Sequence, residues 1–221
     1  MNIDIRYKTA FATLFVTLAP GESIVAEAGA MASMSKHVQV YTRFNGGFWR
    51  ALMRRIFGGE SLFINTFHCP EGGPPAELVL SQPTPGDLEC IELAGQKLFL
   101  QPGAYVASTP GVTLGLGYAG FASWFGGEGL FKLQVSGHGK VWLGGYGGIY
   151  TRDIQQEYVV DTGHILAYEP TLNLSVGLSG GIFSSFFGGE GFVSRMKGQG
   201  RVYLQSRSIE GLAQWTNRQL W

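Results

Sequence analysis

The sequence predicts an all-β protein in which one structural unit is repeated three times in tandem. The tetrad Phe-Gly-Gly-Glu begins at Phe57, Phe125 and Phe187, at intervals of about 65 residues, as in proteins that stack copies of one supersecondary unit. Each copy of such a unit buries its apolar face against the next copy, so the copies share a core. We therefore expect units of the β-sandwich or double-stranded β-helix type, arranged with internal pseudo-threefold symmetry in a single compact domain of residues 1–221.

The residues on both sides of the tetrads give each unit its expected elements. Before each tetrad, apolar residues stand at helical spacing, which predicts a short helical turn. After the second and third tetrads, alternating runs meet at Gly137-His138-Gly139 and at Gly198-Gln199-Gly200. This pattern predicts β-hairpins with Gly-x-Gly turns.

Turn signals and a proline-rich insertion set the limits of the units. Pro20-Gly21 and Pro102-Gly103 follow strand-like runs, and Thr162-Gly163 takes the corresponding place in the third copy. Pro-Gly favours a type II turn because proline fixes φ and glycine supplies a positive φ. The segment 69–75 cannot lie inside a central strand and is expected to be a surface loop. The units are placed at about residues 10–89, 90–153 and 154–208, followed by a short helix in the C-terminal segment 209–221.

Charged residues are few and balanced. They make up 14% of the chain, with 16 basic and 16 acidic residues, whereas ordinary soluble domains contain about 25%. Such a chain exposes a neutral surface, hides surface in an oligomer or lies against a membrane. Because no net charge attracts a phosphate backbone, we expect no DNA binding, and RNA binding is disfavoured.

No targeting signal and no disulfide framework is recognisable in the sequence. Residues 1–6 have neither the apolar core of a secretory signal nor an Arg/Ser-rich leader, and no run approaches the roughly 18 apolar residues of a membrane helix. Cys69 and Cys90 have no metal-type spacing, and we expect both to be free thiols. The expected location is the cytoplasm, with peripheral membrane association left open.

Motifs near the N-terminus carry a family resemblance. Leu18-Ala19-Pro20-Gly21-Glu22, Ala26-Glu27-Ala28-Gly29-Ala30-Met31 and the later Phe-Gly-Gly-Glu-Gly copies resemble the family of altered inheritance of mitochondria protein twenty-four, and the likeness covers nearly the whole chain. That family includes uncharacterised bacterial proteins and a mitochondrial inner-membrane member linked to cristae organisation. Its fold is grouped with that of the tryptophan RNA-binding attenuation protein. The resemblance implies a compact, repeated and oligomeric β fold with no catalytic residues to carry over, and the missing mitochondrial leader points to a bacterial member.

Three patterns that could carry chemistry favour structural roles. The run Gly115-Leu116-Gly117-Tyr118-Ala119-Gly120 matches a dinucleotide fingerprint, but neither a full-length helix nor a suitably placed acidic residue follows. The tetrad glutamates could converge on a cation, although a glutamate after two glycines can also accept backbone N–H bonds and fix its loop. No His-x-His pair and no nucleophile elbow is present. We expect no enzyme, cofactor or metal site. The tetrad residues with expected structural roles are Gly58, Gly59, Glu60, Gly126, Gly127, Glu128, Gly188, Gly189 and Glu190.

The apolar turns before the tetrads are the candidate interaction site. In the first copy the apolar stripe is combined with three arginines, whereas the other copies have alanine and serine there. Two interpretations stay open. The turns pack together in the core, as apolar residues at helical spacing commonly do, or they form an exposed face that meets another protomer or a membrane. The candidate residues are Phe48, Trp49, Arg50, Leu52, Met53, Arg54, Arg55, Phe57, Phe121, Trp124, Phe183 and Phe186.

These observations favour a non-catalytic, self-associating scaffold or interaction protein. We expect a homo-oligomer, with a trimer favoured, that meets a protein partner or a membrane surface. The alternative is a small-ligand or RNA-binding module similar to the attenuation protein. That alternative requires cationic and aromatic side chains repeated in each unit, and only Lys140 and Arg201 recur at matching positions.

Overall fold

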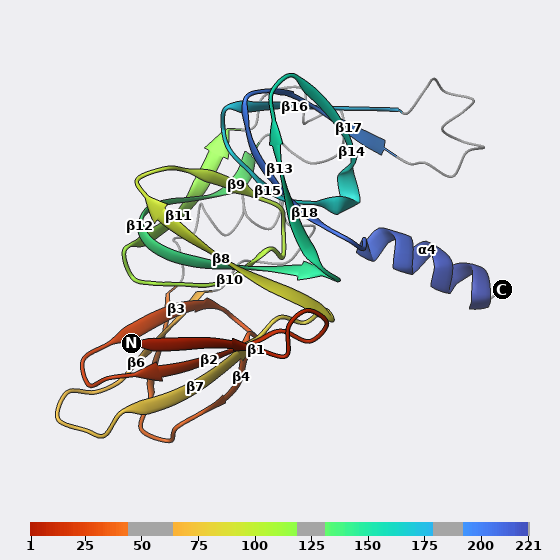
Figure 1. The fold of residues 1–221 in the computed structure, drawn as a ribbon. Coiled ribbons are helices and arrows are strands. Elements are labelled where there is room, and N and C mark those ends of the chain that lie inside the picture. Colours follow the sequence, from red (N-terminus) through yellow and green to blue (C-terminus); the bar gives the residue numbers. More distant parts are fainter. Residues whose placement is uncertain (44–63, 119–130, 179–191, 221) are drawn as a thin grey trace.

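The computed structural model describes residues 1–43, 64–118, 131–178 and 192–220 (Figure 1). In these parts of the chain almost all regular structure is β-strand, so the predicted all-β class is confirmed. The strands lie in layers that follow chain order, with the N-terminal strands in the lowest layer of Figure 1 and the C-terminal strands in the highest. The predicted C-terminal helix is also confirmed, as α4 (Ile209–Leu220).

One pattern of strand pairing occurs three times along the chain, and each occurrence is called a set below. The strands of the first set are β2 (Thr13–Leu18), β3 (Ser23–Glu27), β4 (Met31–Met34), β5 (Gln39–Arg43), β6 (Ile64–His68) and β7 (Ala76–Ser81), preceded by β1 (Asn2–Arg6). Those of the second set are β8 (Gly86–Ala94), β9 (Leu98–Leu100), β10 (Tyr105–Ser108), β11 (Val112–Tyr118) and β12 (Phe131–Tyr146). Those of the third set are β13 (Ile149–Ile154), β14 (Glu157–Asp161), β15 (Ile165–Tyr168), β16 (Leu172–Leu178), β17 (Phe192–Gly198) and β18 (Gly200–Gln205), with the short helix η1 (Thr162–His164) between β14 and β15.

Each set forms two antiparallel three-stranded arrangements. The first has the order β2-β7-β4, β8-β12-β10 or β13-β18-β15. The second has the order β3-β6-β5, β9-β12-β11 or β14-β17-β16. In the second set, the two halves of the long strand β12 take the two central positions that β6 and β7, or β17 and β18, take in the other sets. The sets therefore share their connectivity.

The recurrence extends to single residues. In every set, the pairing of β4, β10 or β15 with its central strand contains one register shift. Just after these strands, Ser35, Thr109 and Glu169 each accept a hydrogen bond through a side-chain oxygen from a backbone N–H of the central strand. The N–H donors are those of Glu77, Lys140 and Arg201, at 2.9, 3.0 and 3.0 Å. We call this contact the clip.

The Gly-x-Gly sequences are not hairpin turns, so that prediction was wrong. β12 runs straight through residues 137–139, and its two halves pair with different strands. β17 and β18 are likewise separated by Gln199 alone and belong to different sheets. The glycines are needed because these strands cross from one sheet to the next against a neighbouring turn. A Cβ at Gly139 would collide with the Thr109 hydroxyl, and one at Gly137 with the Gly111 carbonyl oxygen.

The expected equivalence of the Pro-Gly turns was also wrong. Pro20-Gly21 joins β2 to β3, whereas Pro102-Gly103 joins β9 to β10 and Thr162-Gly163 lies between β14 and β15. The first set makes the equivalent turn where the Ala30 N–H donates to the Glu27 carbonyl over 3.2 Å. Pro-Gly indicates a local backbone conformation and carries no information on which strands the turn connects.

Two further expectations concern the limits of elements. The segment 69–75 lies between β6 and β7, as the predicted loop. The expected limits at residues 89 and 153 lie inside β8 and β13, because the strand-like runs that open the second and third sets begin earlier than the sequence analysis placed them. Cys69 and Cys90 are both free thiols, as expected.

Candidate self-association site

All the candidate interaction residues, Phe48 to Phe57, Phe121, Trp124, Phe183 and Phe186, and the three Gly-Gly-Glu sequences lie outside the described residues. The strands that flank them are described. In each set, the described residues on either side of the tetrad-bearing segment are directly paired residues of two neighbouring antiparallel strands. These pairs are Arg43 with Ile64, Tyr118 with Phe131, and Leu178 with Phe192. The interpretation of the aromatic turns remains a prediction.

The described residues place two equivalent junctions between successive sets. At the first junction, β10 pairs antiparallel with β3, and at the second, β15 pairs antiparallel with β9. Both junctions use corresponding positions. The pairs are Ala107 with Ala26, Ser108 with Val25, Ala167 with Leu100 and Tyr168 with Phe99.

The junctions also join the cores of neighbouring sets. Val106 and Ala107 of β10 pack in the apolar cluster of the first set, with Leu14 and Phe67. Leu166 and Ala167 of β15 likewise pack in the cluster of the second set. The first and second sets therefore each complete their core with a strand from the next set.

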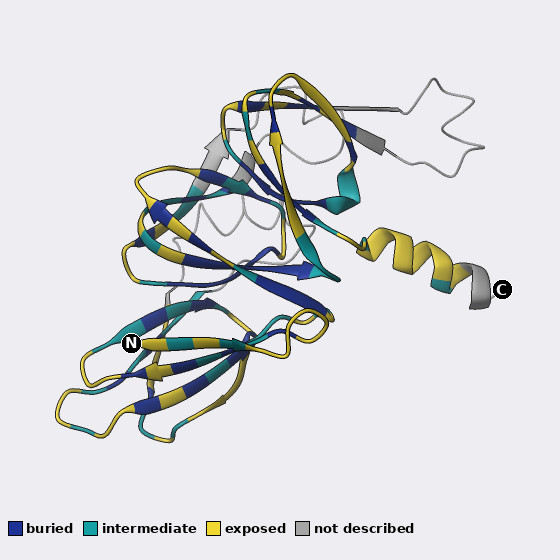
Figure 2. Ribbon diagram, in the orientation of Figure 1, coloured by how far each residue is buried: buried dark blue, intermediate teal, exposed yellow. Residues whose placement is uncertain are grey.

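Burial separates the strand β4 from its two counterparts. Every residue of β10 and β15 is buried, whereas every residue of β4 is exposed (Figure 2). Met34 is 39% exposed, while Tyr168 at the corresponding position is 2% exposed. The difference arises because β10 and β15 each pair with a strand of the preceding set, whereas no described strand pairs with the corresponding edge of β4.

The strand β14 shows the same difference at the other end of the chain. Tyr158 and Val159 are 40% and 51% exposed. At the position of Tyr158 the first set has Ile24 and the second set has Leu98, which are 0% and 2% exposed. Among the described strands β14 pairs only with β17, which leaves its other edge unpaired in the part of the chain that the structure describes.

The two open edges do not meet within one chain. Among the described strands no pairing joins β14 to β4, and the two lie in the highest and lowest layers of Figure 1. An internal threefold axis would bring them together, so the three sets instead form an open row. Proteins commonly protect exposed edges with charged residues, as β13 does with Arg152 and Asp153. By contrast, β4 contains no charged residue, and β14 has charges only at its two ends.

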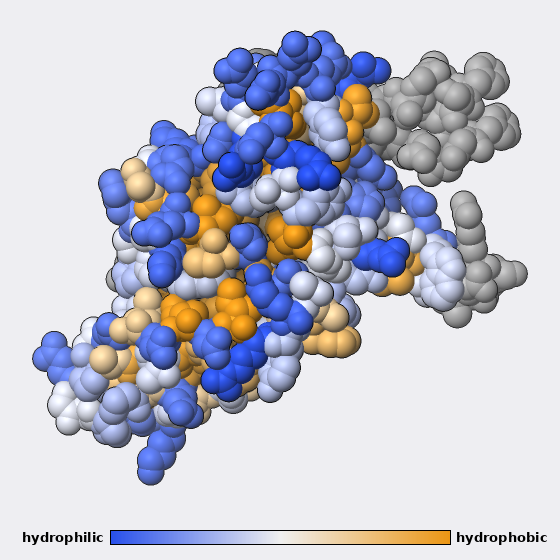
Figure 3. All heavy atoms as spheres, viewed as in Figure 1, coloured by the Kyte–Doolittle hydropathy of each residue, from blue (hydrophilic) through white to orange (hydrophobic). Residues whose placement is uncertain are grey.

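The helix α4 offers a second uncovered surface. Ile209, Leu212 and Trp215 are spaced three residues apart and are exposed, Trp215 by 62%. In Figure 1 the helix projects from the body of the molecule. Figure 3 shows its apolar area separated from other apolar areas on that face by polar side chains. No described helix is long and apolar enough to cross a bilayer.

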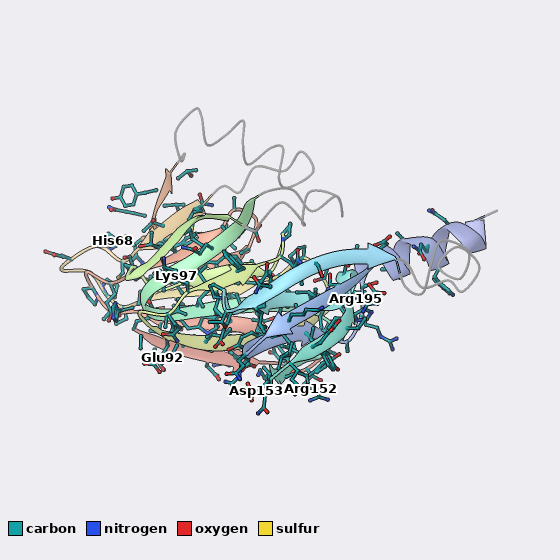
Figure 4. The ribbon with its side chains drawn as sticks, turned by 90° about the horizontal axis from the view of Figure 1, so that it is seen from above. His68, Glu92, Lys97, Arg152, Asp153 and Arg195 are labelled. Carbon is teal, nitrogen blue, oxygen red and sulfur yellow. The ribbon has the colours of Figure 1, made fainter. Side chains whose placement is uncertain are left out.

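The recurring cations Lys140 and Arg201 each line a hollow beside a clip, and the hollow at Lys140 is lined by β1 as well. Each cation lies directly opposite a carboxylate on the neighbouring strand, Glu92 or Asp153, and these carboxylates lie on one side of the molecule (Figure 4). The Arg201 Nε donates to Asp153 over 2.8 Å, and this hydrogen bond lowers the pKa of the Asp153 carboxyl. Since each cation faces a carboxylate, the hollows offer little free positive charge to a phosphate. No group of metal-ligating side chains occurs in the described ranges.

The edge residues Met31, Met34, Tyr158 and Val159 were not among the predicted site residues. A signal for them exists in the difference between equivalent strands. Two of the three, residues 105–108 and 165–168, contain a large aromatic residue, and residues 31–34 contain none. This difference can be seen only when the sequences of the three sets are aligned correctly, and an alignment on the Pro-Gly turns is wrong.

Comparisons with known proteins agree with this architecture. The family model described as mitochondrial biogenesis AIM24 matches residues 3–207. An uncharacterised protein of Streptococcus pyogenes serotype M6 is 27% identical over 229 aligned positions, covering 100% of this chain and 91% of the relative. An X-ray structure of a Streptococcus pyogenes protein, from structural genomics, has a TM-score of 0.77 and 25% identity, covering 98% of each chain. The chain therefore belongs to the mitochondrial biogenesis AIM24 family.

Proposed function

We propose that the protein is a non-catalytic, self-associating scaffold whose chain consists of three copies of one β unit. The observation that carries this proposal is the pair of open edges. β4 is exposed where β10 and β15 are buried, and Tyr158 of β14 is exposed where Ile24 and Leu98 are buried. The shared pairing pattern, register shift and clip support three copies, with unit limits between β7 and β8 and between β12 and β13.

The energetic argument for self-association follows from these edges. An edge strand presents unpaired N–H and C=O groups that can pair with another chain. Burying an exposed Val or Met side chain stabilises a contact by about 1.5–3 kcal/mol. A second copy of this chain carries both complementary edges, so homo-oligomers are favoured, and we favour a trimer. The segment Phe48 to Phe57 remains the predicted contact with a membrane surface or a protein partner.

Small-ligand or RNA binding is the less well supported alternative. It would use the recurring cations, yet Lys140 and Arg201 both face carboxylates. A cation that faces a carboxylate contributes less to the salt-dependent attraction that dominates nucleic-acid binding. The described residues thus favour the scaffold.

Sedimentation equilibrium tests the proposal. The monomer mass is 23.9 kDa, and we expect the weight-average mass to rise with protein concentration across the micromolar range. A constant monomer mass throughout that range would contradict self-association. Variants of the open edges, described below, then separate self-association as such from the surface that mediates it.

A further inference from the structure

We infer that β14 of one copy pairs with β4 of a second copy, head to tail, in the register that both internal junctions use. This inference rests on the proposed self-association and specifies its surface. The internal junctions join β3 to β10 and β9 to β15. In the strand pattern β14 corresponds to β3 and β9, and β4 corresponds to β10 and β15, so the end of one row matches the start of another.

The register follows from the two junctions. Ala26 pairs with Ala107, and Leu100 pairs with Ala167. The corresponding residue of β14 is Val160, because β14 pairs with β17 as β3 pairs with β6 and β9 with β12. The corresponding residue of β4 is Ser33, which follows the shared register shift. The contact between two copies therefore pairs Val160 with Ser33 and, one residue further, Val159 with Met34.

The side chains at these positions fit a buried contact. Val159 and Met34 are apolar and exposed in the single chain. The register places them directly opposite each other, where cross-strand side chains contact. Continuing the antiparallel register beyond the strand places Glu157 across from the exposed Lys36. Because Glu157 already forms ion pairs with Arg195 and Lys197 of its own set, the direction of pairing rests on the register of the two junctions.

The contact is heterologous, since different surfaces of the two copies meet. Such a contact gives a closed ring when the rotation between copies closes, and otherwise an open filament. In a closed ring every β4 and β14 edge is paired. A symmetric contact of β4 with β4, or of β14 with β14, would instead give an isologous dimer, and the following experiment distinguishes the two.

Paired cysteines test the register directly. Met34→Cys and Val159→Cys are placed in separate chains, each with the exposed Cys90 changed to Ser, and one population is labelled with ¹⁵N. Directly opposite residues of antiparallel strands have Cα atoms about 4.5–5.5 Å apart, which is within the range that a disulfide spans. After mild oxidation we expect a covalent dimer from the mixture, with a mass-spectrometric 34–159 link between labelled and unlabelled chains. Each variant alone should form little dimer.

Glu157→Cys supplies the matched control for the register. It lies on the same strand two residues from Val159, which displaces its Cα by about 6.7 Å along the strand. We expect its yield with Met34→Cys to be at least about fivefold lower, because its Cα lies beyond the distance that a disulfide can bridge. Equal yields from Val159→Cys and Glu157→Cys would overturn the register. Dimer formation by a single variant to the same extent as by the mixture would overturn the head-to-tail direction.

Lysine substitutions test whether self-association uses the edges of β4 and β14 or another surface. Met34→Lys or Val159→Lys should raise the dissociation constant at least about tenfold, because lysine on an edge strand opposes pairing. Val40→Lys is the control, since Val40 is 40% exposed on β5, and β5 is an edge outside the inferred contact. If the unmodified chain associates and all three variants associate equally well, the inference fails while the proposed function stands. If the unmodified chain is a strict monomer, both fail.

Discussion

The strands β4, β10 and β15 have the same place in the strand-pairing pattern, but their surroundings differ. All three pair with a central strand through the same register shift and end at the same clip. Yet β10 and β15 are buried throughout, and β4 is exposed throughout. Burial at this position is therefore decided by the neighbouring set. The difference identifies the ends of the row as the places where a further set can be added.

The largest expected effect comes from placing a charge at a junction. Ala107 is fully buried between β3 and β12. Ala107→Glu should lower the free energy of unfolding by at least about 4 kcal/mol, because an unpaired carboxylate is buried. Urea denaturation of dilute protein measures this loss.

The matched control for this substitution is Ser33→Glu, at the corresponding position of β4. Its side chain faces solvent in the single chain, so we expect a change within about 0.5 kcal/mol. Equal losses in the two variants would show that β4 is covered in the monomer, and the comparison between junctions and ends would be wrong.

A smaller effect is expected from truncating a large side chain at the second junction. Tyr168 packs against Phe99 with ring centroids 5.4 Å apart. Tyr168→Ala should cost about 3 kcal/mol through lost burial and a residual cavity. Met34→Ala, at the corresponding open position, should cost below about 1 kcal/mol in dilute protein. Thermal unfolding at low concentration compares them, and a cost for Met34→Ala as large as that for Tyr168→Ala would argue against an open end.

The clip should respond equally at junctions and ends, because it forms within each set. Ser35→Ala and Thr109→Val each remove the acceptor of one backbone N–H and should cost about 1 kcal/mol. Glu169→Gln keeps a side-chain oxygen and should be nearly neutral. Chemical denaturation of the three variants checks this expectation. A loss for Glu169→Gln as large as for the other two would mean that charge, not the hydrogen bond, matters there.

The smallest effect concerns the exposed pair of Asp153 and Arg201. The hydrogen bond from Arg201 lowers the pKa of the Asp153 carboxyl in the folded protein. Its stabilising contribution is therefore present above the unfolded pKa of about 3.9 and is lost as the pH falls through the folded pKa. Asp153→Asn should lower the melting temperature slightly at pH 6 and have no effect at the lowest pH. Because the pair joins β13 to β18, and neither strand is one of the two open edges, self-association should not change.

Part of this molecule could be predicted from sequence alone. Local patterns predicted the β class, the loop at 69–75 and the C-terminal helix, because turn residues and periodicity act over a few neighbouring positions. The role of Gly137 and Gly139 could not be predicted, since it depends on a turn, including Thr109, that packs against them from another part of the chain. A Gly-x-Gly sequence can equally form a hairpin or a strand crossing between sheets.

The candidate site was the harder part. An apolar residue such as Met34 or Val159 looks the same in the sequence whether its side chain faces a neighbouring set or solvent. Only the pairing of β3 with β10 and of β9 with β15 reveals that a partner is missing at each end. The aromatic and arginine residues beside the tetrads are more conspicuous in the sequence and were predicted instead, and these segments lie outside the described residues.

Backbone amide exchange at several protein concentrations tests the central claim most directly. At low concentration the amides of β10 and β15 should be protected, while those of β4 and β14 that face the open edges should exchange rapidly. Raising the concentration should slow exchange in β4 and β14 together and leave β10 and β15 unchanged. Association accompanied by unchanged exchange in both β4 and β14, with new protection elsewhere, for example along α4, would contradict the account.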